Sequence, residues 1–184
     1  THKEWIRLRA LAEQLRYQPL SRLIEQANET PTDEVISSLE SELERILDGK
    51  NGQIAYHVAK AHQYHAVEHF SDVLLWLSVV LALIGAVGHL FFDWSWWIFL
   101  TAFGPAAVGG IHGINGFLGI NTLAEEHETT GQLLAKDLSD LRVLQTQPVR
   151  AEGVLALAKN VLGIVTSRDI RWKESAEKLG LRPA

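Results

Sequence analysis

The chain contains no cysteine and no methionine among its 184 residues. The missing thiols exclude disulfide bonds, cysteine-ligated zinc and catalysis by a cysteine nucleophile. A chain that opens Thr-His-Lys-Glu-Trp, without an initiating methionine, is expected to be a fragment of a longer protein with another domain upstream. The net charge of −5 provides no general attraction to the phosphate backbone, so nucleic acid is not an expected partner.

Charged side chains are also missing from two long runs of the sequence. No Asp, Glu, Lys or Arg occurs between Val73 and Phe92, and none occurs between Trp94 and Ala124. Each run reaches the roughly 20 predominantly apolar residues that a helix needs to cross the hydrocarbon core of a bilayer. The sequence therefore predicts a transmembrane helical hairpin with spans at about 73–92 and 96–121, and the lipid bilayer as a partner.

The residues between the two spans predict how the hairpin is oriented. Five large aromatic residues lie between His89 and Trp97, as in the aromatic belt at a membrane surface, and this segment has no Lys or Arg. Lys60 and Lys136 flank the opposite ends of the spans. By the positive-inside rule we expect a multi-pass protein of the bacterial inner membrane with both termini in the cytoplasm.

Outside the spans, apolar residues recur at helical spacing and predict an all-α protein. We expect N-terminal cytosolic helices in 1–52, interrupted near Pro19, with a second helix capped by Thr30 and ending at Gly49. The hairpin and its cytosolic stalk would occupy 53–146, and a C-terminal cytosolic helix 147–184. The fold class is thus a membrane hairpin extended into a cytosolic helical bundle.

One motif raises the question of catalysis. His65-x-x-Glu68-His69 is the spelling of the inverted zinc-peptidase motif, in which two histidines hold the metal and the glutamate activates water. A helix would place His65 and His69 on one face, and the hairpin could return Glu125, Glu126 or His127 to the same membrane edge. The stretch is also rich in histidine, which fits two other interpretations. In the first, the histidines form a helix face that binds nothing. In the second, that face changes its charge near neutral pH. We predict no catalytic residue, no cofactor and no enzyme activity, with a membrane-bound metalloenzyme as an alternative.

The second predicted span is rich in small residues, and two polar side chains interrupt it. Small residues let helices approach closely in lipid, whereas polar groups at membrane depth face protein or water. The pattern fits both helix packing and the lining of a pore. The residues expected to take part are Gly109, His112, Gly113, Asn115, Gly116 and Gly119 in the second span, with Ser78, Ala82 and Gly85 in the first.

Three short motifs carry a resemblance to a known family. They are Trp5-x-x-x-Arg9-x-x-Ala12-Glu13-x-Leu15-Arg16, Gln53-x-x-x-Tyr56-His57, and Pro105-Ala106-Ala107-x-Gly109-Gly110-Ile111. Together with the regular apolar face at Leu134, Leu138 and Leu141, they resemble SLATT domains. These are two-transmembrane effector domains found beside SLOG nucleotide-sensing domains and SMODS nucleotide cyclases in bacterial conflict systems.

The resemblance implies a function that the residues alone do not give. A SLOG-like domain, fused upstream or adjacent, would sense a nucleotide signal. The hairpins would then form a homo-oligomer that permeabilises the inner membrane in antiviral defence, as a pore-forming effector. A membrane anchor or scaffold for the sensor domain is the alternative.

Overall fold

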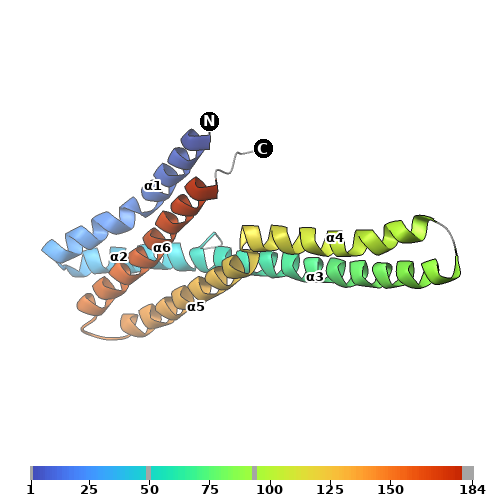
Figure 1. The fold of residues 1–184 in the computed structure, drawn as a ribbon. Helices are drawn as coiled ribbons and strands as arrows, with labels where there is room; N and C mark the ends of the chain where they lie inside the picture. Colours follow the sequence, from blue (N-terminus) through green and yellow to red (C-terminus); the bar gives the residue numbers. More distant parts are fainter. Residues whose placement is uncertain (1, 49–50, 93–94, 180–184) are drawn as a thin grey trace. The chain divides into compact units, whose positions relative to one another are not determined.

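A computed structural model describes the backbone of residues 2–48, 51–92 and 95–179, and the side chains of 4–48, 51–92 and 95–167. In this part of the chain the regular secondary structure consists of α-helices and no strands, which confirms the predicted all-α class (Figure 1). The predicted helix end at Gly49 lies outside these ranges. The helices are α1 (His2–Glu29), α2 (Asp33–Leu47), α3 (Gln53–Phe91), α4 (Ser95–Leu118), α5 (Ile120–Gln145) and α6 (Ala151–Leu179).

The chain divides into two compact units, of which the first combines Thr1–Tyr56 with Thr130–Ala184. In it α1, α2 and α6 contact one another, and the C-terminal part of α5 completes the core. Apolar residues at helical spacing form this core because each helix has to remove one face from water. The largest fully buried side chains of this core are Leu20, Leu39, Leu43, Leu47, Leu134, Leu141, Val154 and Val161.

Helix α1 runs without a break through Pro19, so the interruption predicted there is wrong. Proline removes only one backbone donor and usually kinks a helix rather than ending it when packing on both sides is strong. Tyr17 and Leu20, on either side of the proline, are both buried in the core. Packing of the flanking turns therefore accounts for the continuity of α1.

The N-cap of α2 is Thr32 and not Thr30, the threonine that the sequence predicts. The Thr32 side chain, not that of Thr30, accepts a hydrogen bond from the backbone N–H of Val35 at 3.4 Å. Thr32 has the extended backbone that an N-cap residue requires, and Asp33 and Glu34 follow in the first turn. Two threonines flank Pro31, and only the second directly precedes the helix.

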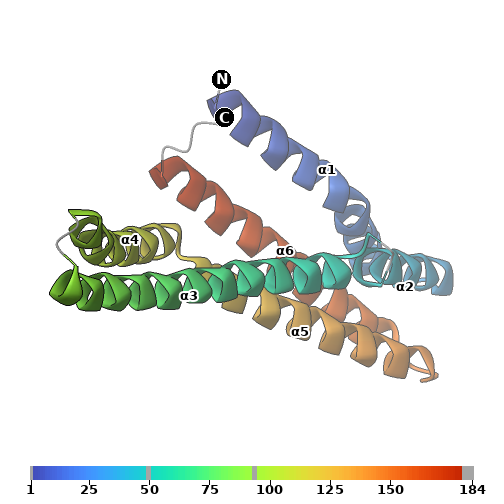
Figure 2. The same cartoon turned by 90° about the vertical axis from the view of Figure 1, so that its right-hand side faces the viewer.

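The second unit spans His57–Thr129 and contains most of α3, all of α4 and the start of α5. Helix α3 begins at Gln53 and continues through the whole first apolar run, as the sequence predicts. Figures 1 and 2 both show α4 alongside the latter half of α3. Both helices are long and apolar enough to cross a membrane.

Gly119 separates α4 from α5. Its φ of 59° lies in the left-handed region, which side chains with a Cβ rarely adopt. The helix of the second apolar run consequently ends at Leu118 rather than at residue 121, and a new helix starts at Ile120. Gly119 thus forms the break between the two helices.

Candidate functional site

Helices α3 and α4 are antiparallel and pack against each other through small residues. A Cβ on Gly104 would lie 2.6 Å from the Cβ of Ala82 and 2.6 Å from the carbonyl oxygen of Ser78. A Cβ on Gly85 would lie 2.8 Å from the backbone nitrogen of Thr101. The first-span residues Ser78, Ala82 and Gly85 are therefore used inside the chain, where they bring two backbones close together.

Gly104 is the partner that the predicted set of site residues omits. Its signal in the sequence is the small residue itself, directly before Pro105. Gly88 makes a similar contact nearer the end of α3, where a Cβ would overlap the ring of Trp97 at 2.5 Å. Glycines on both helices are thus needed for this contact.

The second-span glycines are placed differently, because the chain itself leaves them open. A Cβ on Gly109, Gly113 or Gly116 would meet no atom within 4 Å. Positions three and four apart share one face of a helix, so these three residues form one strip, which we call the α4 glycine face. His112 lies on the same face and is exposed. Nothing within the described chain fills this surface.

Asn115 is the predicted site residue that points toward α3. The hydroxyl of Ser71, which is buried, lies 3.5 Å from Asn115 Oδ1, at the outer limit of a hydrogen bond. A polar pair of this kind joins two apolar helices and is costly to separate in lipid. The structure therefore divides the two polar side chains of α4: Asn115 lies toward α3, and His112 lies on the α4 glycine face.

The His65-x-x-Glu68-His69 motif forms a small polar cluster on the surface of the second unit. His65 Nδ1 lies 3.3 Å from Glu68 Oε2, and His65 Nε2 lies 3.5 Å from Glu128 Oε2 of α5. Glu128 is an acidic residue of α5 in contact with the motif, and it is not one of the three residues, Glu125, Glu126 and His127, that the sequence suggested. Among the described residues, no three His, Asp or Glu side chains are grouped so as to hold a metal ion.

Two other histidines meet in the interior of the same unit. His57 of α3 and His127 of α5 are both buried, and their ring centroids are 5.1 Å apart. The ring of Tyr64 lies 5.5 Å from that of His127. His57 therefore packs against α5, whereas His65 and His69 are exposed.

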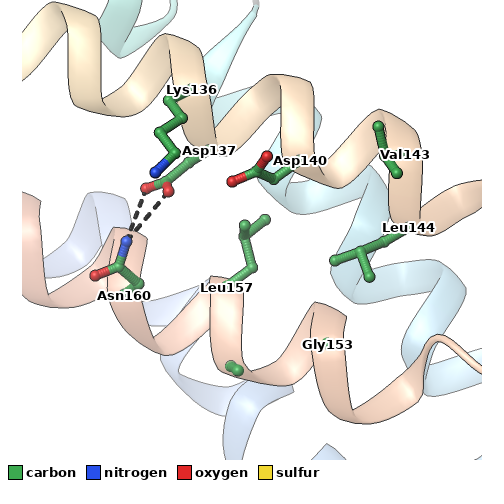
Figure 3. Close-up of a pocket in the computed structure, with 9 residues that line it drawn as sticks. Lys136, Asp137, Asp140, Val143, Leu144, Gly153, Leu157 and Asn160 are labelled. Carbon is green, nitrogen blue, oxygen red and sulfur yellow. Dashed lines mark hydrogen bonds between the residues drawn. The ribbon is translucent and has the colours of Figure 1, made fainter.

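The first unit has an open groove between α5 and α6, with a volume of about 520 Å³ (Figure 3). Asn160 donates two hydrogen bonds to the carboxylate of Asp137, at 3.0 and 3.2 Å. Burial, and secondarily the charge of Asp140, raise the pKa of Asp137 against the opposing effects of Asn160 and Lys136. The groove is lined by Lys136, Asp137, Asp140, Val143, Leu144, Gly153, Ala156, Leu157 and Asn160.

The largest feature of the second unit is its exposed apolar surface. Only 17% of the most apolar window of α3, and 6% of that of α4, is buried. Side chains as large as Trp76, Leu90 and Phe117 are more than half exposed. Soluble monomers rarely expose contiguous apolar surface on this scale, and such surface marks contact with a membrane or another protein.

Comparison of the chain with protein-family models, with curated proteins and with solved structures found no match.

Proposed function

We propose that this chain is a membrane effector module. Helices α3 and α4 insert as a hairpin into the bacterial inner membrane, and several copies assemble there and permeabilise it. The observation that carries the proposal is the exposure of two helices of membrane-spanning length, with mean hydropathy of 2.3 and 1.4 in their most apolar windows. A core helix of a soluble protein of similar hydropathy would be mostly buried.

The α4 glycine face is the surface through which we propose that copies assemble. In lipid there is no hydrophobic driving force between helices, so association depends on close van der Waals contact at small residues. Gly109, Gly113 and Gly116 offer such a surface, and the chain does not use it internally. A polar side chain such as His112 is costly against lipid, which favours protein or water opposite it.

The activating signal is the part of the proposal that rests on the family resemblance. In SLATT-like systems an associated SLOG-like domain senses a nucleotide, and the membrane domain responds. The resemblance lies in segments such as Trp5-x-x-x-Arg9 at the start of α1 and Pro105-Ala106-Ala107 in α4. We propose the same division of labour here, with no catalytic step in this chain.

Dye release from vesicles of phosphatidylethanolamine and phosphatidylglycerol tests the proposed function. Gly113→Leu adds a bulky side chain to the α4 glycine face, at a position where a Cβ meets no atom of the chain within 4 Å. Gly110→Leu is the matched control, because Gly110 is equally open but lies at the side of the α4 glycine face, about 100° around the helix from Gly109 and about 120° from Gly116.

We expect release from vesicles containing the unchanged chain or Gly110→Leu, and release at least about tenfold slower with Gly113→Leu, as in disrupted small-residue interfaces. With a sensor domain attached, release should depend on its nucleotide. Equal release by both variants would remove the α4 glycine face from the proposal. Vesicles that stay tight under all conditions would instead favour the membrane anchor.

A further inference from the structure

Helix α1 exposes three leucines on the side that faces away from the core of the first unit. The exposed fractions are 65% for Leu8, 49% for Leu11 and 58% for Leu15, whereas Ile6 and Leu20 on the other side are buried. At 100° per residue, the three leucines lie within about 60° of one another around the helix. We call them the α1 leucine stripe. Large apolar side chains gathered on a surface mark a contact site.

Two arginines without a partner in the chain lie beside this stripe. Arg7 is about 40° around the helix from Leu11, and Arg22 is about 20° from Leu15, two turns further along. Both side chains are exposed. Neither forms an ion pair or a hydrogen bond within the part of the chain that the structure describes. Their charges are therefore available to a partner outside the chain.

The charge of the surrounding sequence indicates that this partner is anionic. Residues 2–22 contain five basic and two acidic residues, although the whole chain has a net charge of −5. The next segment, 25–48, contains eight acidic residues and one basic residue. Positive charge is thus concentrated on α1. Basic side chains attract the anionic lipids of a bilayer over about a Debye length, about 8 Å at physiological salt.

Other occupants satisfy only one of these two features. The same stripe of a second copy would bring like charges together, which is unfavourable. Helix α2 of a second copy has the opposite charge, but α2, which the structure describes in full, exposes no large apolar side chain. Nucleic acid would neutralise the arginines and leave the leucines in water. The surface of an anionic bilayer provides both phosphates and an apolar layer.

We propose that α1 lies in the surface plane of an anionic bilayer. The α1 leucine stripe is buried below the headgroups, and Arg7 and Arg22 extend to the lipid phosphates, as in amphipathic helices of this composition. The inference rests on the proposed membrane location, because the inserted hairpin tethers the first unit to a bilayer. It adds a second, peripheral contact with a defined lipid chemistry.

A fluorophore on single-cysteine variants of the full-length chain tests this contact, since the chain has no native cysteine. The vesicles are phosphatidylcholine alone, or phosphatidylcholine with about a third of phosphatidylglycerol as the anionic lipid. Leu8→Cys reports on the stripe. Gln14→Cys is the matched control, because Gln14 is exposed about 120° around the same helix. Leu83→Cys reports separately on insertion of α3, where Leu83 is 61% exposed.

Phosphatidylglycerol should reduce acrylamide quenching of the Leu8→Cys fluorophore at least about threefold and change that of Gln14→Cys little, because only the stripe enters the lipid. The Leu83→Cys fluorophore should be protected in both kinds of vesicle.

Removal of the two arginine charges tests the electrostatic part in the Leu8→Cys background. Arg7→Gln and Arg22→Gln should each lower the ratio of docked to undocked α1 about fivefold, as expected for one basic residue at an anionic surface. Arg142→Gln removes an exposed arginine of α5 and is the control that should leave the ratio unchanged. Circular dichroism should show the same helix content in all variants, since these side chains lie outside the core.

The possible failures are distinguishable. A protected Leu83→Cys fluorophore with Leu8→Cys quenched in both kinds of vesicle would refute docking of α1 and leave the hairpin in place. Quenching at both positions would refute the membrane location as well. Equal protection of Leu8→Cys in the two kinds of vesicle would exclude a role for anionic lipid. Protection that rises with protein concentration in detergent without lipid would assign the stripe to a second copy and overturn the proposal.

Discussion

Gly104 of α4 lies directly against Ala82 of α3, at a separation that leaves no space for a side chain. A Cβ on Gly104 would lie 2.6 Å from the Ala82 Cβ and equally close to the carbonyl oxygen of Ser78. The carbonyl belongs to the backbone of α3, so it cannot rotate out of the way as a flexible side chain could. The contact between the two apolar helices therefore requires glycine at this position.

Gly104→Ala should weaken the packing of α3 on α4, by about 1–3 kcal/mol as for overpacked interiors. Gly110→Ala is the matched control, because it makes the same change in the same helix where no neighbouring atom lies within 4 Å. Both variants gain the same helix propensity, so their difference isolates the steric contact. Thermal unfolding in detergent, followed by circular dichroism, should give the lower midpoint for Gly104→Ala. Equal midpoints would contradict the close contact.

The ion pair between Arg150 and Glu40 should contribute more to stability than that between Arg142 and Asp48. Both are 2.6 Å long, but the Glu40 side chain is 10% exposed, whereas both partners of the second pair are more than half exposed. Arg150→Ala leaves a nearly buried carboxylate without its partner and should cost about 1–3 kcal/mol. Arg142→Ala should cost about 0–1 kcal/mol.

Thermal midpoints of the two arginine variants, measured side by side at low and high salt, check this order. Salt should reduce the small effect of Arg142→Ala further and leave that of Arg150→Ala largely in place, since buried pairs are screened less. A larger loss for Arg142→Ala would show that burial of Glu40 is not the deciding factor.

Asp137 should make the first unit less stable as the pH rises from about 4 toward 7. Burial raises the pKa of this carboxyl in the folded chain. Its favourable contribution is therefore fully present below the pKa of an unfolded aspartate, about 3.9, and is lost as the pH rises through the folded value. Asp137→Asn cannot ionise, so its stability relative to the unchanged chain should increase between these two pH values.

Thermal midpoints at about pH 4 and at pH 7 measure this effect, and Asp140→Asn is the control on the neighbouring turn of α5. Asp140 acts on Asp137 only as a nearby charge, secondary to burial. Its variant should therefore change the difference between the two midpoints less than Asp137→Asn does. A relative stability of Asp137→Asn that falls with rising pH would refute the assigned direction.

Leu39→Ala should be among the more damaging substitutions in the first unit. The Leu39 side chain is fully buried in the core, and truncating a buried leucine costs about 2–5 kcal/mol. Leu8→Ala makes the same chemical change at a leucine that is 65% exposed. Its thermal midpoint in detergent, at a concentration low enough to keep the chain monomeric, should stay close to that of the unchanged chain. Similar losses in the two variants would contradict the placement of Leu39.

Helix periodicity made the helices and much of the core predictable, because burying one face leaves a regular trace in the order of residues. Leu39 and Leu43 are examples, as both lie in the second helix that the sequence predicts between Thr30 and Gly49, and both are buried. The residue that caps a helix was less predictable where two neighbouring residues suit the same position. Thr30 and Thr32 both suit a helix cap, and only the completed helix selects Thr32.

For the candidate site, too, the sequence predicted some features and left others to the structure. Composition alone identified Ser78, Ala82, Gly85, Gly109, Gly113 and Gly116 as small residues in apolar runs. It could not say which of them meet each other, because that depends on the register between two helices. The structure assigns the first three to the α3–α4 contact and leaves the glycines after Pro105 open.

The sequence by itself determined the all-α class and the two uncharged runs, since both follow from which residues stand next to one another along the chain. Only the tertiary structure decided the partners across the chain: Gly104 against Ala82, Arg150 with Glu40, and His57 beside His127. It also decided which side of α1 stays exposed. The physical reason is that helix periodicity is a local property, whereas these contacts depend on how the helices are placed against one another.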